Sequence, residues 1–475
     1  MIRKFIGKML GRRRGAGRSG SKGGLRKNAH RYRASELGIH HGEVSTAAMR
    51  TCETLQKAGF KAYVVGGGVR DLIAKLQPKD FDVSTDATPQ EVVELFRRAR
   101  LIGRRFQIVH VIFGRETIEV STFRSLQTNT ETDDHGRVLR DNVWGTHWED
   151  AARRDFSINA LYYDPIGDEI LDFHDGVADM RGKTIRMIGD PATRYREDPV
   201  RMLRTARFAA KLGFEVEEQT RAPMQTLASL ISNVPKARLF DEMLKLLTSG
   251  NAMACLHELR RAGLDRGLLP LLDVILEQSE GERFITEALS RTDKRVKTGK
   301  TLSPGFLFAT LLWHQVNERW QQSLTAGEHK IPALMDAIDS VLDEQAGQLA
   351  IQKRYTSDMR EIWSLQPRFE KRSGQAPYRL IEHMRFRAAY DFLLLRCDTE
   401  TADPELGRWW TDFLDGDPEA RELLVNRAPA GSGRKRNRNR RRRRSKNPLS
   451  ADPDQLASSA SELEQANPKT NHGDA

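Results

Sequence analysis

Hydrophobic and polar positions follow one pattern in the first part of the chain and another in the rest. Up to about residue 190, short apolar runs alternate with amphipathic stretches. This pattern predicts strands at Phe60–Val65, Phe81–Ser84, Ile108–Phe113 and Thr117–Phe123, and helices at Val44–Gly59, at Val69–Leu76 and after Thr88-Pro89. Beyond that point the spacing is almost wholly helical, as at Pro199–Gly213, Gln219–Leu230, Ala237–Ser249 and Ala252–Gly263. The predicted fold class is therefore α+β, a small mixed-sheet head followed by an all-α region.

Charge separates both ends of the chain from its body. Residues 1–40 carry a net charge of +11 and residues 426–475 a net charge of +7, so the residues between them are net acidic. The run Arg434–Arg444 contains no apolar residue, so we expect it to be disordered and to bind nucleic acid rather than a membrane. The chain thus divides into a basic disordered arm (1–40), a head (41–190), a helical region (191–425) and an arginine-rich disordered tail (426–475).

Cysteine usage and hydropathy bear on the compartment. Cys52, Cys255 and Cys397 are scattered and form no CxxC pair, which predicts a reducing, cytoplasmic setting without structural zinc. No apolar run approaches the roughly 18 residues that a transmembrane helix needs. Residues 1–10 are interrupted by Lys8 and make a poor signal peptide, although a weak contact of this segment with a membrane surface stays open.

Two aspartates one residue apart are the most informative chemical feature. Asp80 and Asp82 follow a glycine-rich turn, Val64-Val65-Gly66-Gly67-Gly68-Val69-Arg70-Asp71. Carboxylates at i and i+2 of a strand project from the same face, where a divalent cation relieves their repulsion. Glycines let backbone N–H groups approach an anion, and an arginine adds a forked positive charge. A phosphate cradle beside paired metal carboxylates indicates nucleotidyl transfer, in which two ions roughly 3.5–4 Å apart are the usual solution.

Two candidates compete for a third carboxylate of this site. Glu119 lies between Ile118 and Val120, as a strand residue facing a cleft would. Asp155 follows Arg153 and Arg154, which favour a place beside phosphates, but it could equally cap a helix. The residues alone leave this choice open.

A further motif begins the helical region. Asp198 precedes Pro199 and could simply cap a helix, but Asp198 and Arg201 lie three residues apart and face the same way. An acceptor beside a donor can pair with the edge of a base. Arg201, Arg204 and Lys211 also form a basic stripe at helical spacing that suits a triphosphate or an RNA end, or else a solvated helix face.

The ordered motifs GGxVRD, KDFD, RRDFSINAL and EDPVRMLR resemble those of the class II nucleotidyltransferases of RNA 3′ ends. This family comprises tRNA CCA-adding enzymes and bacterial poly(A) polymerases, and the resemblance covers roughly residues 60–270. LIGRRFQIVHVIFG, the segment Ile381–Asp391 and the arginine-rich C-terminal extension are similar to the poly(A) polymerase I branch. An acidic loop at 125–137 is shorter than in some relatives.

The resemblance implies roles for individual residues and a division of the helical region. Its implied active-site carboxylates are Asp80, Asp82 and Asp155, of which Asp80 and Asp82 would bind Mg²⁺ in a two-metal site. Its implied nucleotide-binding residues are Gly67, Arg70, Arg154, Asp198 and Arg201, the last two as a protein template for the base. The helical region would comprise a neck with an RNA-binding region (191–290) and a body or C-terminal domain (291–425).

The resulting hypothesis is a template-independent enzyme, expected to be a monomer, that adds AMP from ATP to RNA 3′ ends and releases pyrophosphate. The arginine-rich tail is expected to contact RNA. One alternative is a tRNA CCA-adding enzyme on the same scaffold, because an Asp–Arg template serves both bases. A second is an RNA-binding scaffold with an inactive head, against which the intact carboxylates argue.

Overall fold

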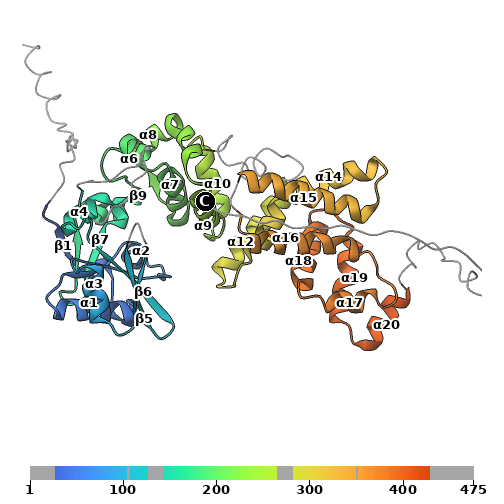
Figure 1. Cartoon of the computed structure of the whole chain (residues 1–475), viewed down its shortest axis with the longest axis horizontal. Helices are drawn as coiled ribbons and strands as arrows, with labels where there is room; N and C mark the ends of the chain where they lie inside the picture. Colours follow the sequence, from blue (N-terminus) through green and yellow to red (C-terminus); the bar gives the residue numbers. More distant parts are fainter. Residues whose placement is uncertain (1–26, 104–106, 127–142, 265–281, 349–350, 428–475) are drawn as a thin grey trace, which may run out of the picture. The chain divides into compact units, whose positions relative to one another are not determined.

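The structure is a computed structural model that describes residues 27–103, 107–126, 143–264, 282–348 and 351–427. Its head contains an eight-stranded sheet (Figure 1), in the order β1 (His30–Arg33), β8 (Glu169–Asp172), β7 (Leu161–Asp164), β2 (Ala62–Val65), β3 (Asp82–Thr85), β6 (Glu116–Thr122), β5 (Ile108–Phe113) and β4 (Ala99–Ile102). Within this sheet β3 and β6 run parallel, whereas the other neighbouring strands are antiparallel. The sheet is mixed, which confirms the predicted fold class of the head.

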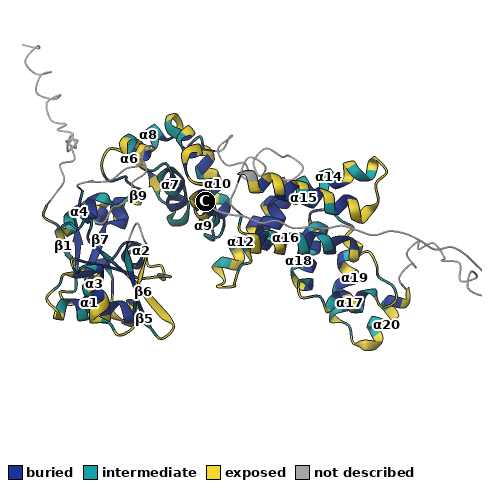
Figure 2. Ribbon diagram, viewed as in Figure 1, coloured by how far each residue is buried: buried dark blue, intermediate teal, exposed yellow. Residues whose placement is uncertain are grey.

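Local signals explain the helices of the head, which are α1 (Thr46–Lys57), α2 (Gly67–Ile73), α3 (Pro89–Leu95), α4 (His147–Arg153) and α5 (Gly176–Gly182). Ser45 caps α1 by accepting hydrogen bonds from two backbone N–H groups. Thr88 and Glu91 form a reciprocal capping box at the start of α3, with Pro89 at the first helical position. Helix α1 packs against β2, β3 and β6. The central strands are largely buried (Figure 2), as their apolar runs predict.

The segment from residue 30 to residue 39 corrects one expectation. Strand β1 pairs with β8 at the edge of the sheet, and a 3-10 helix (Ala34–Leu37) follows it. Ala34, Leu37 and Ile39 are buried in the main core. The prediction that all of residues 1–40 form a basic disordered arm is therefore wrong here. It was based on the net charge of the segment, which does not reveal the few apolar residues that are buried. Residues 1–26 and 428–475 lie outside the described residues, as does most of the predicted loop at 125–137.

Strand pairing also continues past the predicted limit of residue 190. Glu215–Val216 (β10) pairs in parallel with Thr184–Ile185 (β9). Two-residue strands are too short to leave a periodic signature in the sequence. This pairing ties residues 215–216 back to the head.

The rest of the described chain is helical, as predicted. Its helices are α6 (Pro191–Glu197), α7 (Val200–Leu212), α8 (Glu218–Leu227), α9 (Lys236–Leu247), α10 (Ala252–Arg261), α12 (Glu282–Lys297), α13 (Pro304–Leu311), α14 (Trp313–Thr325), α15 (Lys330–Gln348), α16 (Lys353–Leu365), α17 (Ala376–Ile381), α18 (Phe386–Asp398), α19 (Pro404–Asp415) and α20 (Pro418–Arg427). The predicted helix Gln219–Leu230 ends earlier, at Leu227, and continues as a 3-10 helix (Ala228–Asn233). None of the described helices is long and apolar enough to cross a lipid bilayer.

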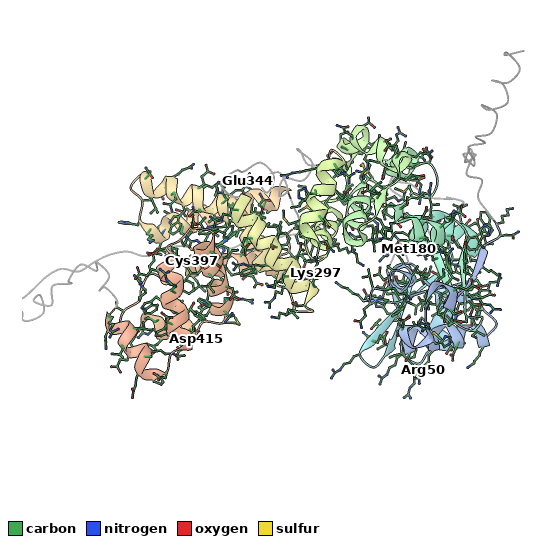
Figure 3. The ribbon with its side chains drawn as sticks, turned by 180° about the vertical axis from the view of Figure 1, so that it is seen from behind. Arg50, Met180, Lys297, Glu344, Cys397 and Asp415 are labelled. Carbon is green, nitrogen blue, oxygen red and sulfur yellow. The ribbon has the colours of Figure 1, made fainter. Side chains whose placement is uncertain are left out.

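Hydrophobic packing groups these helices into two cores. The main core runs from the head to α16 and includes Phe392 and Leu395 of α18, whereas the other buried apolar residues of α17–α20 share a separate core around Trp410 and Phe413. The indole N–H of Trp410 donates a hydrogen bond to the carbonyl oxygen of Phe369 at 2.9 Å. Cys397 near the end of α18 and Asp415 at the end of α19 mark this part of the chain in Figure 3. The described residues all belong to one compact unit.

Burial of the 3-10 helix after β1 generates a prediction. Leu37→Ala removes a buried side chain, so we expect the free energy of unfolding to fall by about 2 kcal/mol or more. Glu36→Ala, at the exposed neighbouring position, should change it by less than about 0.5 kcal/mol. Chemical denaturation of both variants measures the difference. Equal, small effects would show that this segment is dispensable to the head.

Candidate active site

The glycine turn joins β2 to α2. Gly66 has a φ of +77°, a backbone angle that residues with a side chain rarely adopt. A Cβ atom on Gly68 would lie 3.0 Å from Cδ1 of Phe81 and 3.3 Å from the carbonyl oxygen of Asp80. The glycines therefore allow the turn to pack directly against the segment that carries the two aspartates.

Asp80 and Asp82 lie beside this turn, at the start of the next strand. Asp82 is the first residue of β3 and pairs in register with Val65, the last residue of β2. Asp80 precedes the strand, and both residues are exposed. The strand-face argument thus applies to Asp82, while Asp80 is brought close by the chain that leads into β3.

Glu119 adds a further carboxylate to this group. It is the register partner of Asp82 across the parallel pair β3–β6. Its Oε1 lies 3.5 Å from Nε2 of His110, its partner on β5. Glu119 is exposed, so its carboxylate can reach a ligand in front of the sheet. The structure therefore places Asp80, Asp82 and Glu119 near one another at the start of β3.

Desolvation and nearby negative charge change the acidity of Asp82. The residue keeps contact with solvent, yet desolvation by the surrounding atoms, followed by the negative charge of Glu119, raises the pKa of Asp82 to about 6. Arg154 opposes this shift, and Asp80 adds to it. The ionised carboxylate is thus held in a place where a cation would be favourable.

Asp155, the other sequence candidate, occupies a different setting. Its Oδ2 forms an ion pair with Nη2 of Arg204 at 2.6 Å, and its Oδ1 accepts hydrogen bonds from the backbone N–H of Phe156 and the side chain of Asn159. Burial opposes its charge, but Arg204 and Asn159 lower the pKa of the Asp155 carboxyl below its ordinary value. The carboxylate is 10% exposed and already paired. The geometry shows Asp155 joining the head to α7.

Arg154 connects the turn, the sheet and the neighbouring helix. Its guanidinium donates hydrogen bonds to Oη of Tyr162 at 3.1 Å, to Oγ of Ser84 at 3.2 Å and to Oδ2 of Asp150 at 3.2 Å. A Cβ atom on Gly66 would lie 3.2 Å from its Nη1. This cation therefore lies directly under the turn. Because its side chain is 23% exposed, it can still contact a bound anion.

Arg70 is more enclosed than its motif suggests. The residue is 4% exposed, and its guanidinium donates to Oδ1 of Asp71 through Nε and Nη2 and to Oδ1 of Asn159 through Nη1. A Cβ atom on Gly67 would lie 3.6 Å from Nη2 of Arg70. The arginine supports the turn from below, and its direct contact with a triphosphate stays a prediction.

An open pocket of about 430 Å³ lies where α7 and α9 meet the head. Its lining is mostly charged and consists of Arg154, Asp155, Asp198, Val200, Arg201, Arg204, Arg238, Asp241, Glu242 and Lys245. Four of the sequence-predicted residues, Arg154, Asp155, Asp198 and Arg201, therefore share one pocket. The pocket is suited to a polar ligand that presents both donors and acceptors.

Asp198 and Arg201 are each held by a neighbour. Asp198 is the C-cap residue that follows α6, and its Oδ2 accepts a hydrogen bond from Nη2 of Arg238 at 2.9 Å. Its buried Oδ1 has no hydrogen-bond partner within the described part of the chain. Nη1 of Arg201 donates to the carbonyl oxygen of Arg194 and to Oε2 of Glu197. An acceptor with unused capacity thus lies beside a fixed donor group.

The basic stripe on α7 has a different use from the one that its spacing suggested. Arg204 pairs with Asp155, and Nζ of Lys211 lies 3.0 Å from Oδ2 of Asp71. These two cations fasten α7 to the head. Sequence reasoning missed Arg238 on α9, which pairs with Asp198, because its neighbourhood carries no motif apart from helical spacing.

Among the described residues, no group of three or more His, Cys, Asp or Glu side chains is arranged to hold a metal ion. The carboxylates at β3 are instead an open, partly solvated group. Mg²⁺ commonly binds such sites through one or two carboxylates, with waters and substrate phosphates completing its shell.

Comparison with known proteins matches three family models. Residues 62–186 match the poly A polymerase head domain, residues 213–276 the probable RNA and SrmB-binding site of polymerase A, and residues 326–445 the polymerase A arginine-rich C-terminus. A solved structure described as a tRNA-processing enzyme in an apo form has a TM-score of 0.52 at 18% identity, covering 80% of this chain and 99% of its own. That likeness shows the shared fold.

Curated relatives extend over most of the chain. Poly(A) polymerase I of Haemophilus influenzae is 42% identical over 83% of this chain and 90% of its own, and that of Salmonella typhi is 43% identical over 82% and 86%. A CCA-adding enzyme of Lactobacillus helveticus is 39% identical, but over only 43% of this chain and 50% of its own. The chain therefore belongs to the bacterial poly(A) polymerase I family, whose wider kin include the CCA-adding enzymes.

Proposed function

We propose that this protein is a polynucleotide adenylyltransferase that transfers AMP from ATP to the 3′ end of RNA without a nucleic-acid template. The 3′ hydroxyl oxygen of the RNA forms a bond to the α-phosphorus of ATP. The bond from that phosphorus to the oxygen that bridges the α- and β-phosphates breaks, and pyrophosphate leaves. The observation that carries the proposal is the group of Asp80, Asp82 and Glu119 directly beside the glycine turn. Membership of the family supports the same activity.

The acidic group fits Mg²⁺. Asp82 lies close enough to Glu119 and Asp80 for their charges to raise its pKa, and a divalent cation there would relieve that repulsion. Asp80 and Asp82 would hold the ions, which when bound polarise the phosphates and lower the pKa of the attacking hydroxyl. The glycine turn and the partly exposed Arg154 would bind the triphosphate from the other side.

Glu119 and Asp155 would divide the remaining acidic roles. Glu119 is exposed and adjacent to Asp82, so we assign it to the metal-binding group. Asp155 is buried against Arg204, so we assign it to positioning the wall of the pocket rather than to direct metal contact. This assignment follows geometry that the residue pattern could not supply.

The pocket would select the base through Asp198 and Arg201. Adenine presents an amino donor next to a ring-nitrogen acceptor, which matches a carboxylate acceptor beside a guanidinium donor. The unpartnered Oδ1 of Asp198 can accept a hydrogen bond from the amino group of adenine while Arg238 donates one to Oδ2. Cytosine presents the same pair of groups, so the size and position of the pocket must favour adenine.

RNA would reach this site from the helical region, and the arginine-rich tail would add non-specific affinity for its backbone. Residues 213–276 match a family model described as a probable RNA-binding site. The dense cations of residues 434–444 attract phosphates whatever the sequence. We propose that the enzyme works in the cytoplasm, consistent with its three free, buried cysteines.

Neutralising either aspartate tests the chemistry. Asp80→Asn and Asp82→Asn should each lower AMP incorporation into an RNA primer by at least about 100-fold, because the metal ion that holds the triphosphate would lose a carboxylate ligand. The control is Glu94→Gln, an exposed change on α3 that should leave the rate unchanged. Extension assays use ATP or CTP, with a generic RNA or a tRNA. Near-normal rates in both aspartate variants would reject the mechanism, and preferential CTP use on tRNA would identify a CCA-adding enzyme.

The raised pKa of Asp82 predicts how stability depends on pH in the metal-free protein. A carboxyl whose pKa is raised in the folded state lowers the stability of the fold as the pH rises. The loss begins at the ordinary pKa of an aspartate and is complete above the folded pKa of about 6. Asp82→Asn should therefore raise the melting temperature at about pH 7.5 and have little effect near pH 4. Adding Mg²⁺ at about pH 7.5 should stabilise the wild type more than the variant. Melting differences that are the same at both pH values would contradict this view of the site.

The tail predicts a salt dependence of RNA binding. Replacing the arginines and lysine of residues 434–444 with glutamine should weaken binding of single-stranded RNA and flatten the slope of log affinity against log salt concentration. The loss should be large at about 50 mM salt and small at about 300 mM. Replacing the acidic residues after position 450 with their amides is the matched control and should not lower affinity. An unchanged slope in the glutamine variant would exclude the tail as an RNA contact.

A further inference from the structure

One face of α7 packs against the head. Arg204, Phe208 and Lys211 follow each other at spacings of four and three residues, which places them on the same side of the helix. Arg204 pairs with Asp155, and Lys211 pairs with Asp71. Two ion pairs therefore fasten this helix, one on each side of Phe208.

Phe208 is the centre of this contact. The residue is 6% exposed, and the guanidinium carbons of Arg207, Arg70 and Arg204 lie 4.4, 4.9 and 5.2 Å from the centre of its ring. The ring of Phe156 meets it edge-on, with centres 5.7 Å apart. A buried aromatic face among three cations is an electrostatically favourable arrangement that an aliphatic side chain cannot reproduce.

Arg70 carries this contact to the glycine turn. Its Nη2 lies beneath Gly67, while Asp71 and Asn159 hold the guanidinium in place. The turn that would cradle phosphates and the ring of Phe208 therefore contact the same buried arginine. This arginine belongs to the support of the turn.

Arg207 carries the contact in the other direction. Its Nε donates a hydrogen bond to Oε1 of Glu242 on α9 at 2.5 Å. The same helix supplies Arg238, which holds Asp198. Helix α7 itself bears Arg201, one turn before Arg204. The orientation of α7 therefore sets where the base pocket lies relative to the glycine turn.

We propose that Phe208 is a positioning residue that holds α7 at a fixed orientation to the head, and so determines which base the Asp198–Arg201 pair accepts. This inference rests on the proposed function. Adenine and cytosine offer the pair the same donor and acceptor, so the two bases differ mainly in how far the pairing edge lies from the ribose. A pocket held at the purine distance favours ATP, and a loosened α7 loses that preference.

Phe208→Leu tests this role, because it keeps an apolar side chain and removes the aromatic face. The ratio of kcat/KM for ATP to that for CTP should fall at least about fivefold, with a rise in KM for ATP. Phe208→Tyr retains the ring and should retain the ratio. The control is Phe392→Leu, which alters a fully buried ring packed on Phe284 and Trp313 in the helical region. It should lower the melting temperature and leave the ratio unchanged.

The outcomes separate this inference from the proposed function. A wild-type protein that incorporates no AMP would reject the function itself. An active Phe208→Leu variant whose ratio stays within about twofold of the wild type would overturn the role of Phe208. If Phe208→Leu does not fold, Lys211→Met provides the second test, because it releases the end of α7 from Asp71 at a partly exposed position. It should shift the ratio in the same direction, and an unchanged ratio there would likewise overturn the proposal.

Discussion

Repulsion among carboxylates at the start of β3 is the constraint on which the rest of the site depends. Asp82 lies next to Glu119 because β3 and β6 pair in parallel. Asp80 lies in the short segment that leads into β3. Desolvation of Asp82, followed by the negative charges of Glu119 and Asp80, disfavours its ionised state and raises its pKa. Stability alone would favour neutral residues at these positions, and this supports the cation-binding role that we propose for them.

The surrounding structure can be understood as the support of that acidic group. Glycines at 66–68 bring the turn against Asp80, and Arg154 lies under the turn with hydrogen bonds to both the sheet and α4. Asp155 and Asp71, which belong to the same motifs, bind cations of α7. The motifs thus combine residues that face a ligand with residues that fasten the pocket to the head, and their proximity in sequence reflects both tasks.

The sequence predicted what depends on neighbouring residues. Strand β5 and the start of α3 were predicted closely, because an apolar run bounded by glycine and a Thr-Pro cap act locally. The α+β order and the helical second part also followed from periodicity. Pairings between distant segments were not accessible: the register of Asp82 with Glu119, the burial of Arg70 against Phe208 and the hold of Arg238 on Asp198 all join residues tens of positions apart. The single buried face of residues 34–39 was hidden by its basic surroundings.

The most direct test of the central claim is a crystal structure of the protein with Mg²⁺ and a non-hydrolysable ATP analogue. The account predicts cation density between Asp80, Asp82 and the triphosphate, with Glu119 nearer to it than Asp155 and the adenine between Asp198 and Arg201. A cation bound away from β3, or a base outside the pocket formed by α7 and α9, would contradict it.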